Sequence, residues 1–226
     1  MGNNICISHL IRKTTPSYGN RDYVLIKDNS SIKKGETANT SCWILSNNHI
    51  GTHIDVAYHF CEDGKKTFEI SIDDYFFDNV LVVDILCPDA RLIGTADFKG
   101  LNLVNDDSTV ELILIRTGYE QYRGMDKYWN DNPGLSSDLA DYFRERFPQL
   151  RCVGFDFISL TSWKFREEGR KSHRAFLCPG EGKKEILVIE DMSLDRINAS
   201  IRRVIVAPMF VEDGNGGAVT VFAQVE

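Results

Sequence analysis

The chain has 226 residues, and 42% of them are hydrophobic, which predicts one domain spanning 1–226 around one sizeable core. It carries 26 basic and 33 acidic residues, a formal net charge of −7, with no long basic run. This charge pattern argues against nucleic acid or an anionic membrane as a partner, and no apolar stretch is long enough to span a bilayer.

Stretches rich in β-branched and aromatic residues recur along the chain, and several are continuous apolar runs typical of strands covered on both faces. In chain order we expect strands at 23–27, 43–46, 80–86, 110–116, 152–157, 186–190, 203–207 and 218–225. Between them we expect a helical turn at 95–99, a helix at 137–147, another helical turn at 193–197 and a turn at 214–217. Leu139, Phe143 and Phe147 repeat at helical spacing, Ser136 can cap that helix and Pro148 ends it. The predicted class is a single sheet-rich α/β domain.

The cysteines are widely scattered and include no Cys-x-x-Cys pair. The N-terminus also lacks the charged and apolar regions of a secretory signal. We therefore expect a cytoplasmic protein with buried free thiols rather than disulfides. The six cysteines are Cys6, Cys42, Cys61, Cys87, Cys152 and Cys178.

The most informative segment is 49–60, which holds three of the five histidines. It offers His49, His53, Asp55 and His59, and imidazole and carboxylate are ligands that divalent transition metals bind readily. His53 and Asp55 are two residues apart, so on an extended segment both side chains leave by the same face. The segment predicts a metal site.

Two more candidate ligands lie downstream. His173 lies in a basic stretch, where an ordinary surface histidine is the simpler interpretation if it is considered alone. Glu190 ends an apolar run, so it is either a carboxylate facing water or a buried one that a cation must meet. The residues alone leave both alternatives open.

The segment 49–60 resembles the motif His-x-Gly-Thr-His-x-Asp-x-Pro-x-His-Phe of the cyclase-like metal-dependent hydrolases, which include bacterial kynurenine formamidase and isatin hydrolase. Every fixed position is present except the proline, which is Ala57. Weaker similarities follow in the family's order along nearly the whole chain. They lie at 7–10, 115–119, 132–136, 153–156, 189–194 and 207–209.

The resemblance implies the family's swivelling β/β/α fold and a role for each candidate. It implies that His49, His53 and Asp55 bind a first metal ion. It also implies that Asp55 bridges to a second ion held with His173 and Glu190. His59 matches the histidine that transfers protons. One or two zinc ions are expected, with manganese possible, and the family implies a homodimer or homotetramer.

These ligands predict hydrolysis of a small-molecule amide, because zinc lowers the pKa of bound water towards ~7 and polarises a carbonyl. His59 would take up the proton and deliver it to the departing nitrogen. The family resemblance favours an aryl formamide such as N-formylkynurenine, or a small cyclic amide. A lactone or a biosynthetic cyclisation precursor is the alternative substrate, and a non-catalytic metal-binding homologue is the third hypothesis. Aromatic residues that could line a pocket are more often core residues, so they do not identify the substrate.

Overall fold

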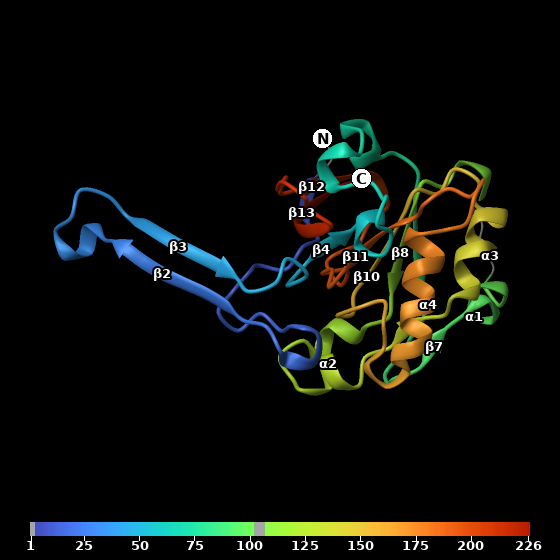
Figure 1. Cartoon of the computed structure of the whole chain (residues 1–226), viewed down its shortest axis with the longest axis horizontal. Coiled ribbons are helices and arrows are strands. Elements are labelled where there is room, and N and C mark those ends of the chain that lie inside the picture. The colour runs from blue at the N-terminus through green and yellow to red at the C-terminus, as the bar shows by residue number, and fades with distance from the viewer. Residues whose placement is uncertain (1–2, 102–106) are drawn as a thin grey trace.

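A curled nine-stranded sheet forms the body of the molecule in the computed structural model, which describes residues 3–101 and 107–226 (Figure 1). Within this described part, the strand order is β5-β12-β13-β4-β11-β10-β8-β6, and β1 pairs with β13. The sheet curls enough for β6, at one edge, to contact β12 near the other. The strands are β1 Asn3–Cys6, β4 His53–Asp55, β5 Phe76–Phe77, β6 Val80–Asp84, β8 Leu112–Arg116, β10 Cys152–Phe155, β11 Leu187–Glu190, β12 Ile201–Pro208 and β13 Gly216–Val225.

The sheet has a parallel half and an antiparallel half that meet at β4. Strands β6, β8, β10 and β11 are parallel, whereas β4 is antiparallel to both β11 and β13. In β8, Ile113 and Ile115 pack toward the helices, while Leu112 and Leu114 pack inside the curl. Both faces are therefore buried, which explains the continuous apolar run and confirms the predicted sheet-rich α/β class.

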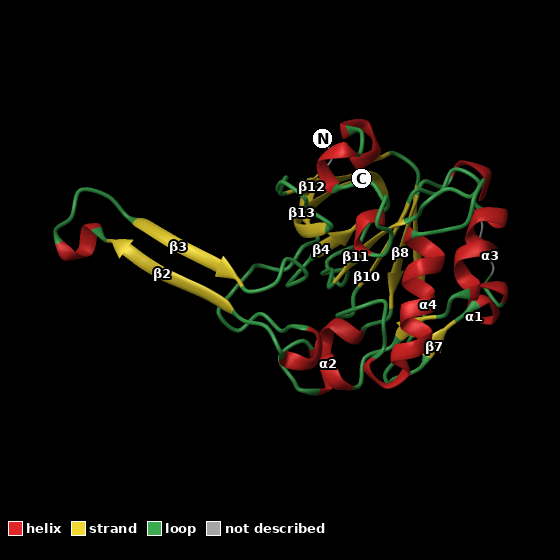
Figure 2. Cartoon of the chain, in the orientation of Figure 1, coloured by secondary structure: helices red, strands yellow, loops and turns green. Residues whose placement is uncertain are grey.

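Helices cover the outer face of the parallel half, as Figure 2 shows for α3 and α4. The four α-helices of the described chain are α1 Thr95–Lys99, α2 Lys127–Asn130, α3 Asp138–Arg146 and α4 Arg166–Leu177. The helices expected at 95–99 and 137–147 are confirmed as α1 and α3. None of the described helices is long and apolar enough to cross a membrane.

Three local predictions are wrong. The residue before α3 is Ser137, not Ser136, and its hydroxyl donates to Glu168 (2.6 Å) instead of capping the helix. The segment 193–197 forms a single hydrogen-bonded turn, from the Ile197 N–H to the Leu194 carbonyl (3.2 Å), and is not helical. The turn before β13 comes earlier than 214–217, since Gly216 and Gly217 already pair with β4.

Two of the predicted strands lie outside the main sheet. Strands β2 (Val24–Ser30) and β3 (Thr40–Leu45) pair only with each other and form a hairpin that projects from the body (Figure 1). We call this hairpin the arm. A second small sheet pairs β7 (Leu92–Ile93) with β9 (Gly134–Leu135).

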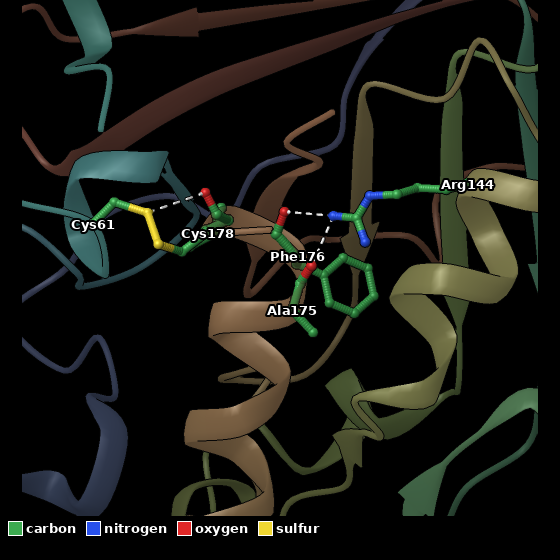
Figure 3. The surroundings of a disulfide bond; sticks show 6 residues. Cys61, Arg144, Ala175, Phe176 and Cys178 are labelled. Carbon is green, nitrogen blue, oxygen red and sulfur yellow. Dashed lines mark hydrogen bonds between the residues drawn. A yellow bond between two sulfur atoms is a disulfide. The ribbon is translucent and has the colours of Figure 1, made fainter. Parts of the chain in front are cut away.

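The expectation of free thiols is wrong for one pair, because Cys61 and Cys178 form a disulfide across 117 residues of sequence. Figure 3 shows this bond at the end of α4, where Arg144 of α3 donates to the carbonyls of Ala175 (2.7 Å) and Phe176 (3.2 Å). The four remaining cysteines are free, but Cys42 is exposed on the arm and not buried. Sequence spacing could not reveal the pairing, since it depends on how α4 packs beside residues 57–61.

Candidate metal centre

Strand β4 lies at the centre of the site because it pairs with a strand on each side. His53 lies opposite Glu190 of β11, and Asp55 lies opposite Gly216 of β13. The side chains of His53, Asp55 and Glu190 are almost completely buried. His53 Nε2 lies 3.3 Å from Glu190 Oε2 and 3.5 Å from Asp55 Oδ1. Two residues of β4 and one of β11 therefore place an imidazole between two carboxylates.

Two further histidines of the segment approach Asp55 from the loops that flank β4. His49 Nδ1 lies 2.7 Å from Asp55 Oδ1, and its Nε2 lies 3.0 Å from Asn215 Oδ1. His59 ends the 3₁₀ helix Ala57–His59 and stacks on His49, with 4.1 Å between ring centroids. Although Ala57 replaces the proline of the family motif, the turn is closed by hydrogen bonds from the N–H groups of residues 60 and 61 to the Ala57 carbonyl.

His173 reaches the same carboxylates from α4. Its Nε2 lies 3.5 Å from both Asp55 Oδ2 and Glu190 Oε1. Its Nδ1 lies 3.0 Å from the Gly169 carbonyl and 3.1 Å from the Thr161 hydroxyl. Donation from Nδ1–H to the carbonyl directs Nε2 toward the carboxylates, the arrangement found in histidine metal ligands. His173 is thus buried at the site and is not a surface residue.

Glu190 is the buried alternative of the two that the sequence left open. Its Oε1 accepts hydrogen bonds from Leu160 N (2.7 Å) and Ser159 Oγ (3.3 Å). Burial raises the pKa of this carboxyl, as does the Asp55 charge, but His173 and His53 outweigh both and lower it to about 2. Glu190 is therefore an anion at neutral pH.

The pKa values of His53, His173 and His59 shift in two different directions. Burial lowers the pKa of His53 and His173, but the Glu190 and Asp55 carboxylates outweigh burial and raise it to about 9 and about 10. Burial also dominates at His59, where the pKa falls to about 4, so this imidazole is neutral at neutral pH. A cation bound between the carboxylates would replace the protons that His53 and His173 carry as a result of their raised pKa.

The donor set fits a divalent transition metal. Asp55 belongs to both groups of donor atoms that could hold an ion, one with His49 and His59 and one with His53 and Glu190. The buried His53 Nε2 has no hydrogen-bond partner among the residues that the structure describes, and a metal ion would satisfy this nitrogen. The grouping differs from the expected sets, because His53 falls with Glu190 and not with His49. In addition, His59 lies among the potential ligands, and His173 lies beside the second group rather than in it.

A cavity of about 260 Å³ opens onto the cluster. The five predicted ligands and His59 all line it, together with ten further residues. These are Tyr18, Arg21, Asp22, Asn47, Phe60, Ile158, Ser159, Thr161, Arg166 and Arg170. A larger cavity of about 800 Å³ lies beside the disulfide but contains none of the predicted ligands. The smaller cavity is therefore the candidate functional site.

A mixed α/β domain with buried carboxylates and imidazoles converging on one cavity defines a protein with a candidate metal centre. A family model described as "Putative cyclase" matches residues 5–161, and the chain belongs to this family. This confirms the resemblance seen in the motif, although His173 and Glu190 lie beyond the matched residues.

The relatives agree with this membership. A kynurenine formamidase of Bacillus cereus (strain ATCC 10987 / NRS 248) is 27% identical over 171 residues, which cover 76% of this chain and 73% of the relative. An uncharacterised protein of Haemophilus influenzae (strain ATCC 51907 / DSM 11121 / KW20 / Rd) is 28% identical over 112 residues, covering 49% of this chain and 78% of the relative. The chain is thus a distant homologue of kynurenine formamidases.

Solved structures share the whole fold. Isatin hydrolase A from Labrenzia aggregata, bound to benzyl benzoate, superposes with a TM-score of 0.81 at 18% identity, covering 99% of this chain and 94% of that one. A structure described as a potential metal-dependent hydrolase with cyclase activity gives a TM-score of 0.74 at 19% identity, covering 100% and 99%. At such identities the likeness establishes the fold and not the substrate.

Proposed function

We propose that the protein is a metal-dependent amidohydrolase that hydrolyses an aryl formamide resembling N-formylkynurenine, or a small cyclic amide. The observation that carries this proposal is the convergence of His49, His53, Asp55, His173 and Glu190 on one cavity. Relatives named kynurenine formamidase and structures named isatin hydrolase support the choice of an amide bond. One or two zinc ions, or manganese, would be held by these residues.

A bound divalent ion would supply an activated water and polarise the amide carbonyl. The protein's own residues would do the rest. Asp55 and Glu190 provide the negative charge that holds the ion, and the Gly51 and Gly169 carbonyls orient His53 and His173. Burial lowers the pKa of His59 to about 4, so its imidazole is unprotonated at neutral pH. It would act as a weak base whose conjugate acid readily returns the proton to the departing nitrogen.

Elemental analysis and a substrate panel test this function. Protein purified without chelator should carry zinc or manganese and should hydrolyse N-formylkynurenine or isatin. Asp55→Ala should lose both metal and activity, since Asp55 belongs to both donor groups. Absence of any transition metal, even after reconstitution, would refute the proposal. Turnover of a lactone alone would place the protein in a different substrate class.

His59→Gln separates proton transfer from metal binding. Glutamine keeps a polar side chain but cannot gain and lose a proton near neutral pH. Turnover should fall by roughly 10²–10⁴-fold, the usual effect of losing a positioned acid–base group, while metal content stays constant. If the variant loses metal, His59 is a ligand beside His49 and Asp55, as their proximity also permits.

We also propose that the protein assembles as a homodimer or homotetramer. The arm supports this proposal, because an isolated two-stranded hairpin is only marginally stable in water. Its apolar side chains are nevertheless open to solvent, with Leu25 41%, Trp43 61% and Ile44 44% exposed. A second copy of the chain would cover them.

A further inference from the structure

Three arginines line the cavity that opens onto the carboxylate and histidine cluster. Arg21 follows the 3₁₀ helix Tyr18–Asn20, whereas Arg166 and Arg170 are one turn apart on α4. The chain as a whole is acidic, with a net charge of −7. A concentration of positive charge at one small cavity therefore runs against the overall composition.

None of these three arginines forms a side-chain hydrogen bond or an ion pair with any residue in 3–101 or 107–226. Other arginines of the molecule are bound to carboxylates or carbonyls. Examples are Arg116, Arg123, Arg144, Arg151 and Arg203. The cavity arginines thus keep their donors free, and a guanidinium has five of them in a rigid fork.

Aromatic packing holds two of the three guanidinium groups in place. Arg21 and Arg166 lie 5.7 Å and 5.0 Å from the Trp163 ring centroid, and Tyr18 meets the same ring edge-on at 5.1 Å. Contacts of this kind stabilise a guanidinium without consuming its hydrogen-bond donors. Arg170 has no such contact and lies one helical turn further along α4.

Tyr18 adds a neutral donor to the wall of the same cavity. Its hydroxyl is buried and has no hydrogen-bond partner among the described residues. Burial raises the pKa of Tyr18 to about 12; Arg166, Arg21 and Arg170 act against this shift, and Glu190 adds to it. The hydroxyl therefore lies within electrostatic reach of the three arginines and of Glu190, and it stays protonated.

We propose that Arg21, Arg166 and Arg170 form a subsite for a carboxylate group of the substrate, with the Tyr18 hydroxyl as an additional donor. This inference rests on the proposed function and narrows its substrate class to amides that carry a carboxylate away from the bond that is cut. The reacting carbonyl lies at Asp55 and Glu190, and the carboxylate lies at the arginines.

A carboxylate suits this subsite for two reasons. The planar fork of an arginine matches two carboxylate oxygens, and a charge-assisted pair of this kind adds both affinity and orientation. In addition, a cavity of about 260 Å³ accepts a small molecule and excludes a large phosphorylated cofactor. Asp22 follows Arg21 on the cavity wall, and its carboxylate accepts hydrogen bonds from Ser46 Oγ (3.5 Å) and Asn47 Nδ2 (3.4 Å).

The test compares N-formylkynurenine with its methyl ester, which has the same formamide but no carboxylate. Metal-loaded protein should prefer the acid. In Arg166→Gln/Arg170→Gln the ratio of kcat/KM for acid to that for ester should fall by roughly 10- to 100-fold, the range expected for losing charge-assisted hydrogen bonds. Arg170→Lys should lower this ratio less than Arg166→Gln/Arg170→Gln does, because lysine keeps the positive charge of arginine but lacks its planar fork of donors.

Lys171→Gln is the matched control. Lys171 lies beside Arg170 on the same helix and is also exposed, but it does not line the cavity. Lys171→Gln removes one positive charge from α4, half of what Arg166→Gln/Arg170→Gln removes, and should leave the ratio within twofold of the wild-type value. An equal fall in Lys171→Gln would show that net charge, not a subsite, sets the preference.

Failure of the proposed function can be told apart from failure of this inference. If neither compound is hydrolysed, the binding of kynurenine and of kynurenine methyl ester is measured by calorimetry on the same metal-loaded proteins. A preference for kynurenine that falls at least tenfold in Arg166→Gln/Arg170→Gln supports the subsite without any turnover. Equal affinity for acid and ester, or a preference that the arginine variants leave unchanged, overturns it.

Discussion

Asp55 illustrates how much of the site depends on the environment of one residue. It is almost completely buried on β4, where an uncompensated carboxylate would be costly. Burial raises its pKa, but the histidines around it, His49 first, hold that pKa well below the usual value. The cluster is therefore a set of mutually dependent charges, and removing any one member leaves another buried without compensation.

Gly169 is a second residue whose identity the site requires. It lies on α4, and a Cβ at this position would lie 2.4 Å from the Thr161 side chain. Its carbonyl also orients His173. Gly169→Ala should therefore cost about 1–3 kcal/mol of stability, despite the better helix propensity of alanine, and should reduce metal affinity. Chemical denaturation and metal titration measure both effects.

Gly180→Ala provides the control for this substitution. Gly180 follows the end of α4, and a Cβ there would meet nothing within 4 Å. The stability and metal affinity of the Gly180→Ala variant should match those of the unmodified protein. If Gly169→Ala is equally neutral, α4 can shift without disturbing His173, and the close approach has no functional consequence.

The raised pKa of Glu120 should make the stability of the folded chain depend on pH. Burial, together with the adjacent Asp195 carboxyl, raises the pKa of Glu120 to about 8. A carboxyl with a raised folded-state pKa keeps its proton in the folded chain after the unfolded chain has lost it, so stability should fall between about pH 4.5 and pH 8. Glu120→Gln should remove that part of the loss. Urea denaturation at pH 5 and pH 8.5 measures it.

The exposed Glu145 of α3 supplies the comparison, because Glu145→Gln makes the same chemical change at a solvent-facing position. Its stability should follow the unmodified protein across this range. A Glu120→Gln profile that also follows the unmodified protein would show that the carboxyl titrates in the ordinary range when folded.

At the scale of elements, the sequence predicted the long apolar strands and α3, and it missed α4. Strands such as β8 are continuous apolar runs, and α3 repeats large apolar residues at helical spacing. The buried face of α4 instead carries Gly169, Ser172 and His173 before Phe176, so no apolar stripe marks it. Short strands such as β4 were missed for a similar reason, since three residues show no period.

The site likewise contains residues that the sequence could predict and residues that it could not. The segment 49–59 could be found because its donors are close in sequence and match a motif. The cavity arginines could not, because Arg21 and Arg166 come together only when residues 18–21 pack against Trp163. A spacing of four residues between Arg166 and Arg170 was the only local signal, and many solvent-facing helices share it.

The disulfide links two elements that carry site residues. Cys61 is two residues after His59, and Cys178 is one residue beyond the end of α4, which carries His173. Because it closes a loop of 117 residues, the bond should stabilise the folded chain by about 2–5 kcal/mol through the entropy of the unfolded state. The thermal midpoint should therefore fall when the protein is reduced, and calorimetry with and without reductant measures the shift.

The double variant Cys61→Ser/Cys178→Ser is the control for reduction. It should melt at the lower temperature with or without reductant, because no bond remains to be broken. If reductant lowers the midpoint of this variant as well, the effect arises elsewhere. Equal midpoints for the oxidised and reduced unmodified protein would contradict the stabilising role.

At the scale of the whole molecule, the curled sheet is what assembles the site. It brings residues 53–55 beside residues 188–190 and 216–218, which are distant in sequence. Apolar periodicity indicates that strands exist but not which strands are neighbours. The family resemblance implied that Asp55 and Glu190 share a site, but neither the resemblance nor the strand pattern predicted the sheet order that brings them together.

The arm is a large feature that this packing leaves uncovered. In its register Leu25 lies opposite Ile44, and Ile26 lies opposite Trp43, so apolar side chains occupy both faces of the hairpin. Exposed apolar side chains on both faces destabilise a two-stranded hairpin in water unless another surface covers them. We therefore expect these side chains to be buried against a second copy of the chain.

Light scattering tests this expectation directly. The unmodified protein should have at least twice the chain mass of 25.7 kDa, and Leu25→Asp/Trp43→Asp should shift the population toward the monomer, because a buried charge without a partner is costly. Lys27→Asp, a polar change on the same arm, should leave the mass unchanged. A monomeric unmodified protein at working concentration would refute the assembly. A mass that persists in Leu25→Asp/Trp43→Asp would place the contact between copies on another surface.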